Sequence, residues 1–564
     1  MVNPPRQYLE HGVPAVLSYW DRQDEFATRK IDQETLYELK LIIVGNSNSG
    51  KSTLVHYLTN KQLPAKALCS THGLTYSSWQ PDWKIDDQEI TVNIIDFGGQ
   101  EYYHGTHHML FSRGAIYLLL WNPGTNDNKM IDTPVGDRTT NALIRHFNVR
   151  YWLNAIEIYS GSLTKTEPMD AGAKKYITPV LLVQTYEDKY GKCFLNLRKI
   201  QEAYDQLFDS VSISLGDGQV SGLEILHCQL EAMVKRMAGQ MQTRYPADWI
   251  RIKRRIEDNE ENYQILTIPQ FKEYFGLDYS DEEARMLCIS LNFWGVALYR
   301  YRTDDSDVVI INPQNFTARV NKILTDDVRK NNGLVTQEAL DEALRKDKSM
   351  TTAFIRVLKL YNILFELPAP NGHPRYIAPM YLAETPDYIR LLMTGFVAYY
   401  QIRYDDYFHK GILLECFKLL GDKLYVEDNL YLYWQWGIVL KKGERVICIE
   451  FDKDNLSTVQ IKMIRIGNEQ LGDDELLEHI FAAFRQINED RYTSEIELSA
   501  DGINFAPKSW LLKQIELEHE KVDIDDTLYA TKDFLFLLSA REKPQTRKKY
   551  SYPIPQKTPT ACSC

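Results

Sequence analysis

The sequence contains no run of about 18 apolar residues that could span a bilayer, and its first 30 residues lack the charged-then-apolar order of a signal peptide. We therefore expect a cytoplasmic protein without a transmembrane segment. An excess of positive charge is also missing, because the formal net charge is -12 at pH 7. Since affinity for nucleic acid depends on Lys and Arg neutralising phosphates, this composition argues against a nucleic-acid partner.

Clustered cysteines and internal repeats are missing as well. The eight cysteines are scattered, and the only close pair, Cys562 and Cys564, has one residue between its members. That spacing is too tight for the usual zinc knuckle, so we interpret most cysteines as buried thiols. No internal repeat is visible. A tail rich in Pro and Lys over 541–564 is expected to be disordered.

The length and composition indicate several ordinary globular domains. A chain of 564 residues is too long for one hydrophobic core. With 44% hydrophobic and 25% charged residues, it does not have the apolar poverty of disordered proteins. The pattern of apolar runs changes twice. It divides the chain into an α/β domain at 38–240, a domain of helices and short strands at 245–390 and an α+β domain at 394–540.

The first domain has the alternating order of an α/β unit. Nearly all-apolar runs indicate strands buried on both faces of a parallel sheet, and a helical pattern follows the first run at Lys51–Leu58. Asp86 and Asp87 separate two extended runs and predict a hairpin turn. A helical pattern over 223–237 closes the unit. The expected strands are Glu38–Val44, Tyr76–Ile85, Ile90–Phe97, Ala115–Trp121, Thr178–Val183 and Val211–Ser214.

The two later domains have different patterns. Pro246 opens a charged amphipathic helix, after which helices alternate with short strands such as Val308–Ile311. The third domain should combine an antiparallel sheet with a helix at Glu475–Ile487. Its expected strands are Tyr431–Leu440, Arg445–Phe451 and Thr458–Ile466.

The clearest chemical signal is the segment Gly45–Ser52, in which Gly, four residues and Gly-Lys-Ser stand between a strand and a helix. Glycines let backbone N–H groups converge on phosphate oxygens at a helix N-terminus, where the dipole favours anions. Lys51 should reach the β and γ phosphates, and the Ser52 hydroxyl should ligate magnesium. A chance glycine-rich turn is the alternative. The expected nucleotide-binding residues are Gly45, Asn48, Ser49, Gly50, Lys51, Ser52 and Thr53.

A second motif, Asp96–Glu101, stands at the end of an apolar strand that should run beside the first strand. Asp96 can hold the magnesium shell through water, while the Gly99 N–H can contact the γ-phosphate and so sense its presence. Gln100 is the candidate for orienting the attacking water, and a solvated loop residue is the alternative.

A loop between the two motifs offers a third magnesium ligand. The Thr71 hydroxyl could bind the metal while the γ-phosphate orders this loop, although Ser70 is a rival and a simple turn is the alternative. His104, His107 and His108 follow the second motif. Because two of them are adjacent, we interpret them as solvated or interface histidines rather than zinc ligands.

Base specificity should come from the loop after the fifth strand, where GTPases usually carry Asn-Lys-x-Asp and this chain has Thr185–Asp188. Asp188 can accept hydrogen bonds from the guanine N1 and exocyclic amine, a pair that adenine cannot offer. Tyr186 would place an aromatic ring where the usual lysine stem covers the base. Ser212 and Ile213, followed by Ser214, occupy the place of the last guanine-side loop.

The second motif and the following Tyr103-His104 resemble the Roc GTPase domain of Roco proteins, in which a COR domain follows Roc. The stretch over 1–37 resembles the linker between leucine-rich repeats and Roc, so we expect a truncated member of a longer protein. Nothing in the sequence resembles a kinase. Segments similar to COR are Pro246–Trp249, Leu291–Val296, Ile311–Gln314, Lys410–Leu413 and Trp436–Leu440.

The resemblance implies a Ras-like P-loop domain followed by a COR domain in two halves, the first winged-helix-like and the second α+β. It implies GTP and GDP binding with Mg2+, slow GTP hydrolysis, and a homodimer through the second half of COR that is coupled to the nucleotide state. Arg113 matches a basic position at the end of the second switch, where it would neutralise transition-state charge or form a structural salt bridge. The alternatives are a nucleotide-stabilised interaction scaffold with negligible turnover and an ATP-driven oligomerising switch.

Overall fold

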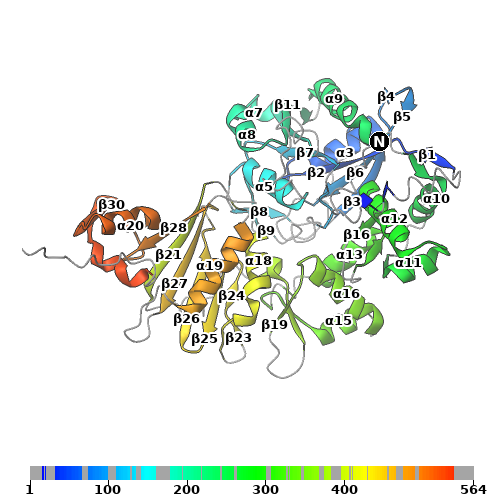
Figure 1. The fold of residues 1–564 in the computed structure, drawn as a ribbon. Coiled ribbons are helices and arrows are strands. Elements are labelled where there is room, and N and C mark those ends of the chain that lie inside the picture. The colour runs from blue at the N-terminus through cyan, green and yellow to red at the C-terminus, as the bar shows by residue number, and fades with distance from the viewer. Residues whose placement is uncertain are drawn as a thin grey trace, which may run out of the picture.

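The computed structural model has three consecutive units, which follow the colour bar of Figure 1 from blue to bluish green, then through green, and finally from yellow to red. Within the residues that it describes, no helix combines the length and apolar character needed to cross a membrane. The described residues are 16–17, 19–20, 32–65, 74–98, 109–112, 114–127, 130–134, 141–160, 178–193, 195–216, 219–241, 244–258, 263–299, 307–324, 328, 331–344, 348–367, 374–382, 396–405, 408, 411–427, 430–453, 456–464, 474–488 and 494–538.

The first unit is built on a six-stranded sheet with the strand order β11-β10-β7-β2-β6-β3. All neighbouring strands run parallel except β3, which lies antiparallel to β6 at one edge. The parallel order brings the carboxyl ends of five strands to one side, where folds of this class bind ligands. The strands are β2 (Glu38–Val44), β3 (Leu74–Trp79), β6 (Thr91–Phe97), β7 (Ile116–Trp121), β10 (Val180–Gln184) and β11 (Leu207–Ser212).

Helices cover both faces of this sheet. Alternate residues of β2 point to opposite faces: Leu41 and Ile43 join one core with α3 and α9, and Ile42 and Val44 join another with α5 and α8. This double coverage explains the nearly continuous apolar strands of the sequence. The helices are α3 (Lys51–Asn60), α5 (Val149–Tyr159), α7 (Glu187–Tyr190), α8 (Leu197–Ala203) and α9 (Leu223–Met241).

The predicted hairpin turn is confirmed, but its strands are shorter than expected. Asp86 and Asp87 have φ values of 50° and 62° and connect β4 (Lys84–Ile85) to β5 (Gln88–Glu89). Short polar side chains tolerate this left-handed conformation better than other residues. The strand expected before the turn is interrupted near Pro81, which cannot donate a ladder hydrogen bond.

Two parts of the first unit differ from the sequence prediction. The strand expected at Val211–Ser214 begins earlier and ends at Ser212, and a short hairpin of β12 (Ser214–Gly216) and β13 (Gln219–Ser221) follows it. A further hairpin, formed by β8 (Met130–Pro134) and β9 (Asn141–Arg145), lies between β7 and α5. This second hairpin was not expected from the pattern of apolar residues.

The middle unit packs helices around two antiparallel sheets, β15-β17-β16 and β18-β20-β19. Thr267 and Gln270 form a capping box that starts α11, and Gly295 ends α12 in the left-handed conformation. The elements are β14 (Arg244–Pro246), α10 (Ala247–Glu257), β15 (Gln264–Leu266), α11 (Ile268–Phe275), α12 (Asp281–Trp294), β16 (Ala297–Tyr299), β17 (Val309–Ile311), α13 (Pro313–Ile323), β18 (Leu334–Thr336), α15 (Gln337–Ala343), α16 (Lys348–Leu360), β19 (Phe365–Leu367), β20 (Arg375–Ile377) and the 3-10 helix η2 (Pro379–Tyr381).

The C-terminal unit contains a seven-stranded sheet with the order β24-β25-β26-β27-β21-β28-β29, and every neighbouring pair in it is antiparallel. The predicted helix is present as α19. The elements are β21 (Phe396–Tyr404), α18 (Gly411–Leu420), η3 (Gly421–Lys423), β22 (Val426–Glu427), β23 (Leu430–Tyr431), β24 (Tyr433–Trp434), β25 (Gly437–Lys442), β26 (Arg445–Phe451), β27 (Thr458–Ile464), α19 (Glu475–Asn488), β28 (Ser494–Ser499), β29 (Ala506–Pro507), α20 (Lys508–Glu516), β30 (Lys521–Ile524), β31 (Thr527–Ala530) and η5 (Thr531–Leu537).

The single strand expected at Tyr431–Leu440 is divided in the structure. A turn at Gln435 and Trp436 separates β24 from β25, which then pair with each other. Gly437 permits this fold-back, because a Cβ atom there would lie 2.2 Å from the ring of Trp434.

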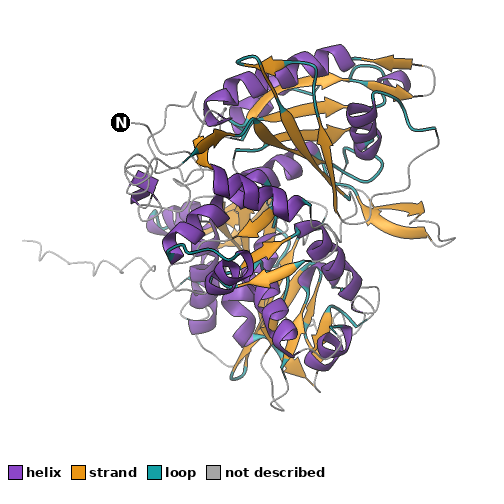
Figure 2. Ribbon diagram, turned by 90° about the vertical axis from the view of Figure 1, so that its right-hand side faces the viewer, coloured by secondary structure: helices purple, strands orange, loops and turns teal. Residues whose placement is uncertain are grey.

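The first unit lies above the other two and contacts both (Figures 1 and 2). Lys253 of α10 is 3% exposed and forms an ion pair with Glu38 of β2 at 3.0 Å. Lys40 donates to the Asn292 carbonyl oxygen at 2.9 Å. Strand β1 (Gln33–Thr35), which precedes the sheet, pairs with β14 of the middle unit. The β8–β9 hairpin lies at the junction with the C-terminal unit.

Candidate functional site

The phosphate loop predicted from the sequence connects β2 to α3. Gly45, Asn48 and Gly50 have positive φ values of 140°, 59° and 84°, so the loop curls back on itself before the helix starts. A Cβ atom on Gly45 would lie 2.2 Å from the Leu120 carbonyl oxygen, which explains why glycine is required there. Ser49 is fully buried, and this curled backbone can present N–H groups to an anion.

Lys51 is held inside this loop. Its Nζ donates to the Gly45 and Asn46 carbonyl oxygens at 2.9 and 2.7 Å, and the residue is 6% exposed. Burial lowers the pKa of Lys51 to about 8, while the nearby Asp96 carboxylate acts in the opposite direction. A partly desolvated ammonium group in a curled glycine loop is suited to hold phosphate oxygens.

Two of the predicted magnesium ligands lie next to each other. The Ser52 Oγ, in the first turn of α3, donates to Asp96 Oδ2 at 2.8 Å, and Asp96 comes from the end of β6. Hydroxyl and carboxylate oxygens are donors that Mg2+ accepts, and the remaining positions of such a site are usually filled by phosphate and water. The two residues therefore fit this ion. Thr53, also predicted, is half-buried in the same helical turn.

The Thr185 side chain forms hydrogen bonds within the protein and does not point toward a ligand site. Its Oγ1 donates to the Ser49 carbonyl oxygen at 2.9 Å and lies 3.3 Å from the Trp121 carbonyl oxygen, and the residue is 3% exposed. The side chain thus ties the end of β10 to the phosphate loop. Tyr186 follows with a φ of 57° and is 38% exposed at the start of α7.

The predicted guanine-binding carboxylate of Asp188 is held by Ser214, which lies in the expected guanine-side loop but was not one of the expected binding residues. Ser214 Oγ donates to Asp188 Oδ1 at 2.7 Å. Ser212 instead lies 3.3 Å from Gln184 Oε1, and the Ile213 side chain is fully buried in the core. The Ile213 N–H and carbonyl oxygen bond to Gln184 and Glu187, so this residue shapes the loop. Ser212 and Ser214 flank the buried Ile213 in the same way, so the sequence pattern alone could not single out Ser214.

The remaining predicted residues lie outside the described part of the chain. They are Thr71, Gly99, Gln100 and Arg113, together with His104, His107 and His108. In the residues that the structure does describe, no group of three or more His, Cys, Asp or Glu side chains could hold a metal ion. Of the five cysteines described there, Cys288, Cys416 and Cys448 are buried thiols, whereas Cys193 is half-buried and Cys228 is exposed.

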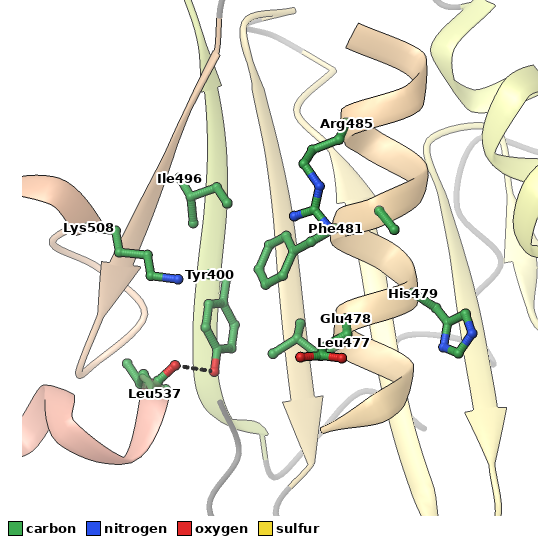
Figure 3. A pocket seen from close by; sticks show the side chains of 10 residues that line it. Tyr400, Leu477, Glu478, His479, Phe481, Arg485, Ile496, Lys508 and Leu537 are labelled. Atoms are coloured by element: carbon green, nitrogen blue, oxygen red, sulfur yellow. Dashed lines mark hydrogen bonds between the residues drawn. The ribbon is translucent and has the colours of Figure 1, made fainter. Parts of the chain in front are cut away.

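Two cavities lie away from these motifs. One, of about 740 Å³, separates β3 and β6 of the first unit from α10 and α13 of the middle unit. The other, of about 370 Å³, lies in the C-terminal unit between α19 and the sheet. Figure 3 shows the aromatic rings of Tyr400 and Phe481 beside the charged ends of Arg485 and Lys508, with the Tyr400 hydroxyl donating to the Leu537 carbonyl oxygen at 3.0 Å. Neither cavity is lined by a residue of the phosphate loop.

Comparisons with known proteins match two of the three units. The family model "Ras of Complex, Roc, domain of DAPkinase" matches residues 40–164, and "C-terminal of Roc, COR-A domain" matches residues 246–382. A Roc-COR-CHAT protease of Runella zeae is 22% identical over 525 residues, which cover 88% of this chain and 51% of that protein. The probable serine/threonine-protein kinase pats1 of Dictyostelium discoideum is 23% identical over 350 residues, which cover 57% of this chain and 10% of that protein.

A solved structure, Methanosarcina barkeri Roco2 RocCORdC bound to GDP, is also similar. It has a TM-score of 0.48 and 22% sequence identity, and the match covers 62% of this chain and 98% of that one. The chain spans about half, or less, of the length of the two curated relatives that it matches.

Proposed function

We propose that this chain, which belongs to the Roco proteins with a Roc domain followed by a COR domain, is a guanine-nucleotide switch that binds GTP and GDP with Mg2+ and slowly hydrolyses GTP. Family membership supplies a GTPase domain of the P-loop class. The preference for guanine, the binding of Mg2+ and the slow rate of GTP hydrolysis are proposed from residues of this chain.

The contact that carries the proposal is the 2.8 Å hydrogen bond between Ser52 and Asp96 beside the buried Lys51. In P-loop proteins the lysine holds β and γ phosphates, and the hydroxyl and the aspartate hold magnesium. All three groups meet at the carboxyl ends of two neighbouring parallel strands, although 45 positions separate Lys51 from Asp96 in the sequence. A phosphate-binding role gives a common reason for burying a lysine and an aspartate beside a serine hydroxyl.

Guanine recognition is proposed for Asp188. Its carboxylate would accept from the guanine N1–H and exocyclic amine, and the Ser214 hydroxyl fixes one of its oxygens at 2.7 Å. A carboxylate left without these donors would lose charged hydrogen bonds, so adenine is disfavoured. We assign Thr185, Ser212 and Ile213 to the shape of this pocket, through the contacts described above.

For hydrolysis, we propose roles for four residues in the segments outside the described structure. Gln100 would orient the attacking water, and Thr71 and Gly99 would respond to the γ-phosphate. Arg113 would neutralise charge in the transition state. These assignments follow the motif positions of the family.

We also propose a homodimer through the C-terminal unit, with its stability coupled to the bound nucleotide. A ligand shifts such a balance only by its differential affinity for the two forms, and a tenfold change in the dimer constant corresponds to about 1.4 kcal/mol. Light scattering over a concentration series with GDP and with a GTP analogue tests this. Identical dimer constants in both would refute the coupling, and a monomer at all concentrations would refute the dimer.

A second candidate function is an interaction scaffold that binds nucleotide without appreciable turnover. The departure at Thr185 and Tyr186 favours it, because the usual asparagine and lysine of the base loop are both replaced. Single-turnover hydrolysis by wild type and by Gln100→Leu separates the two functions. A switch loses rate on this substitution, whereas a scaffold shows the same negligible rate in both proteins.

A further inference from the structure

Asn46, the second residue of the phosphate loop, has its side chain turned into the protein. It is 3% exposed, and its Nδ2 donates to the Thr125 and Phe147 carbonyl oxygens, each at 2.6 Å. Its Oδ1 accepts from the Phe147 backbone N–H at 3.0 Å and from the Trp152 indole N–H at 3.1 Å. An amide side chain can make four such bonds, so Asn46 is fully satisfied. Fully satisfied buried networks hold one arrangement rigidly.

Two residues before Phe147, Arg145 reaches the C-terminal unit. Its Nη1 donates to the Lys453 carbonyl oxygen at 3.0 Å, and its guanidinium lies 5.3 Å from the centre of the Trp436 ring. Arg145 and Trp436 are each 3% exposed. Cation–π contacts are stronger when they are removed from water, so this contact contributes to the junction between the units.

The segment between the two anchors is short, and Phe147 and the two residues after it are held by several contacts. Two residues of extended chain span at most about 7 Å. The Phe147 ring stacks on Tyr151 with 3.9 Å between ring centres, and Asn148 caps α5 by accepting from the Tyr151 N–H at 3.0 Å. Val149 N–H donates to Asn126 Oδ1 at 2.9 Å. A displacement at either anchor is therefore passed to the other rather than absorbed by a flexible loop.

We propose that Asn46 is a positioning residue of the nucleotide site and that the segment Arg145–Phe147 couples the phosphate loop directly to the C-terminal unit. The proposal rests on the nucleotide-binding function given above. Linkage makes the coupling reciprocal: the Arg145 contact stabilises the nucleotide-holding loop, and bound nucleotide stabilises the Arg145 contact. Because the route starts at the phosphate loop and not at Thr71 or Gly99, it responds to GDP as well as to GTP.

The test is a double-mutant cycle on GDP release, measured with a fluorescent GDP analogue in the full chain. Arg145→Ala should speed release about tenfold, which corresponds to about 1.4 kcal/mol. In an Asn46→Ala background the same substitution should change the rate by no more than about twofold, because the route is already broken. Arg198→Ala is the matched control, since this arginine side chain is 92% exposed and pairs only locally with Glu202.

Hydrogen exchange supplies a readout that a merely structural role would not move. Saturating GDP should slow exchange in β26, next to the Lys453 contact, in wild type and not in Asn46→Ala. If Asn46→Ala does not fold, Asn46→Asp keeps both acceptor contacts and removes both donor contacts. It is then cycled with Arg145→Lys, so that a positive charge faces the new carboxylate in both arms and the added charge pair largely cancels. Arg145→Lys serves in the same way, because it keeps the charge and removes the planar group.

The coupling through Arg145–Phe147 would be refuted if Arg145→Ala changed the rate of GDP release equally in wild type and in the Asn46 variant. It would also be refuted if neither Arg145→Ala nor Arg145→Lys changed that rate. If wild type binds GDP no better than Lys51→Ala, the proposed function itself fails. If wild type binds GDP tightly but the effects of the Arg145 and Asn46 substitutions on GDP release are additive, only the coupling is refuted.

Discussion

The phosphate side and the base side of the Roc site are built differently. On the phosphate side, Lys51 and Asp96 are 6% and 3% exposed and are placed by the central strands of the sheet. On the base side, Asp188 lies on the four-residue helix α7, which has no buried residue, and Ser214 holds it through one hydrogen bond. If Lys51 and Asp188 act as proposed, the core preorganises phosphate binding, while base recognition depends on a small surface element. We expect affinity to come mainly from the phosphates and discrimination from a few exposed contacts.

Removing Lys51 should produce the largest effect. Lys51→Ala is expected to abolish tight binding of GDP and GTP, because a charged hydrogen-bond donor to the phosphates is lost. The fold should persist, since the Nζ contacts loop carbonyl oxygens rather than the core. Titration calorimetry measures the affinity and circular dichroism the fold.

Lys61→Ala is the control for that substitution. Lys61 directly follows the same helix, but its side chain is 65% exposed and pairs with Asp82 at the surface. The Lys61→Ala variant should bind GDP and GTP with the affinity of wild type. Unchanged affinity in Lys51→Ala would end the phosphate-loop assignment.

Asp188→Asn should have the next largest effect, and it should act on selectivity. We expect GTP binding to weaken by roughly 1 to 3 kcal/mol, the usual cost of losing a charged hydrogen bond. The affinity for ATP should change little, so the ratio of GTP affinity to ATP affinity should decrease. Competition of GTP against ATP on both proteins measures this. Equal competition in wild type would show that the guanine assignment is wrong.

The pH dependence of binding should report on Lys51. Its pKa is lowered to about 8, so raising the pH through this value removes the ammonium charge from the unliganded protein. Phosphate binding requires the charged form, and affinity should fall by roughly tenfold between pH 8 and pH 9.5. The lowered pKa also affects the stability of the unliganded fold. Between about pH 8 and the higher pKa of Lys51 in the unfolded chain, the unfolded chain binds more protons than the folded one, so the free energy of unfolding increases as the pH rises.

An arginine at position 51 should remove this dependence. Arginine stays charged over the whole range, so Lys51→Arg provides a background for the titration of guanine itself. Calorimetry at several pH values on both proteins is the measurement. Parallel pH profiles would contradict a titrating Lys51.

Ser214→Ala should have the smallest effect. It removes one hydrogen bond to Asp188 but leaves the carboxylate in place, so we expect a loss of about 0.5 to 1.5 kcal/mol in GTP affinity. Ser212→Ala is the matched control two positions earlier, because the Ser212 hydroxyl lies near Gln184 instead. A larger loss in Ser212→Ala than in Ser214→Ala would reverse our assignment of the two serines.

The sequence predicted what depends on local order. The phosphate loop, the Asp86-Asp87 turn and the helix at 475–487 each follow from adjacent residues, and the structure has all three. The meeting of Ser52 with Asp96 was predictable because parallel strands bring their ends together.

Other features depend on contacts between distant residues. The partners of Asn46 lie 79 to 106 positions away, and no spacing rule connects them. Ser212 and Ser214 could not be distinguished without the end of β11, which turns Ile213 inward and Ser214 toward Asp188. The β8–β9 hairpin has a mixed polar sequence without a clear alternation, so its pairing was not visible.

The covered edge of the six-stranded sheet bears on how the protein can be divided for experiments. Strand β3 is the last strand of that sheet, and α13 of the middle unit packs against it. An exposed edge strand offers unpaired backbone groups to other chains and promotes aggregation. Excising residues 38–241 would uncover this edge and separate Glu38 from Lys253. A fragment that keeps the chain from Gln33 through Leu382 retains the β1–β14 pairing and the covered edge, and should stay dispersed at concentrations where the shorter piece precipitates.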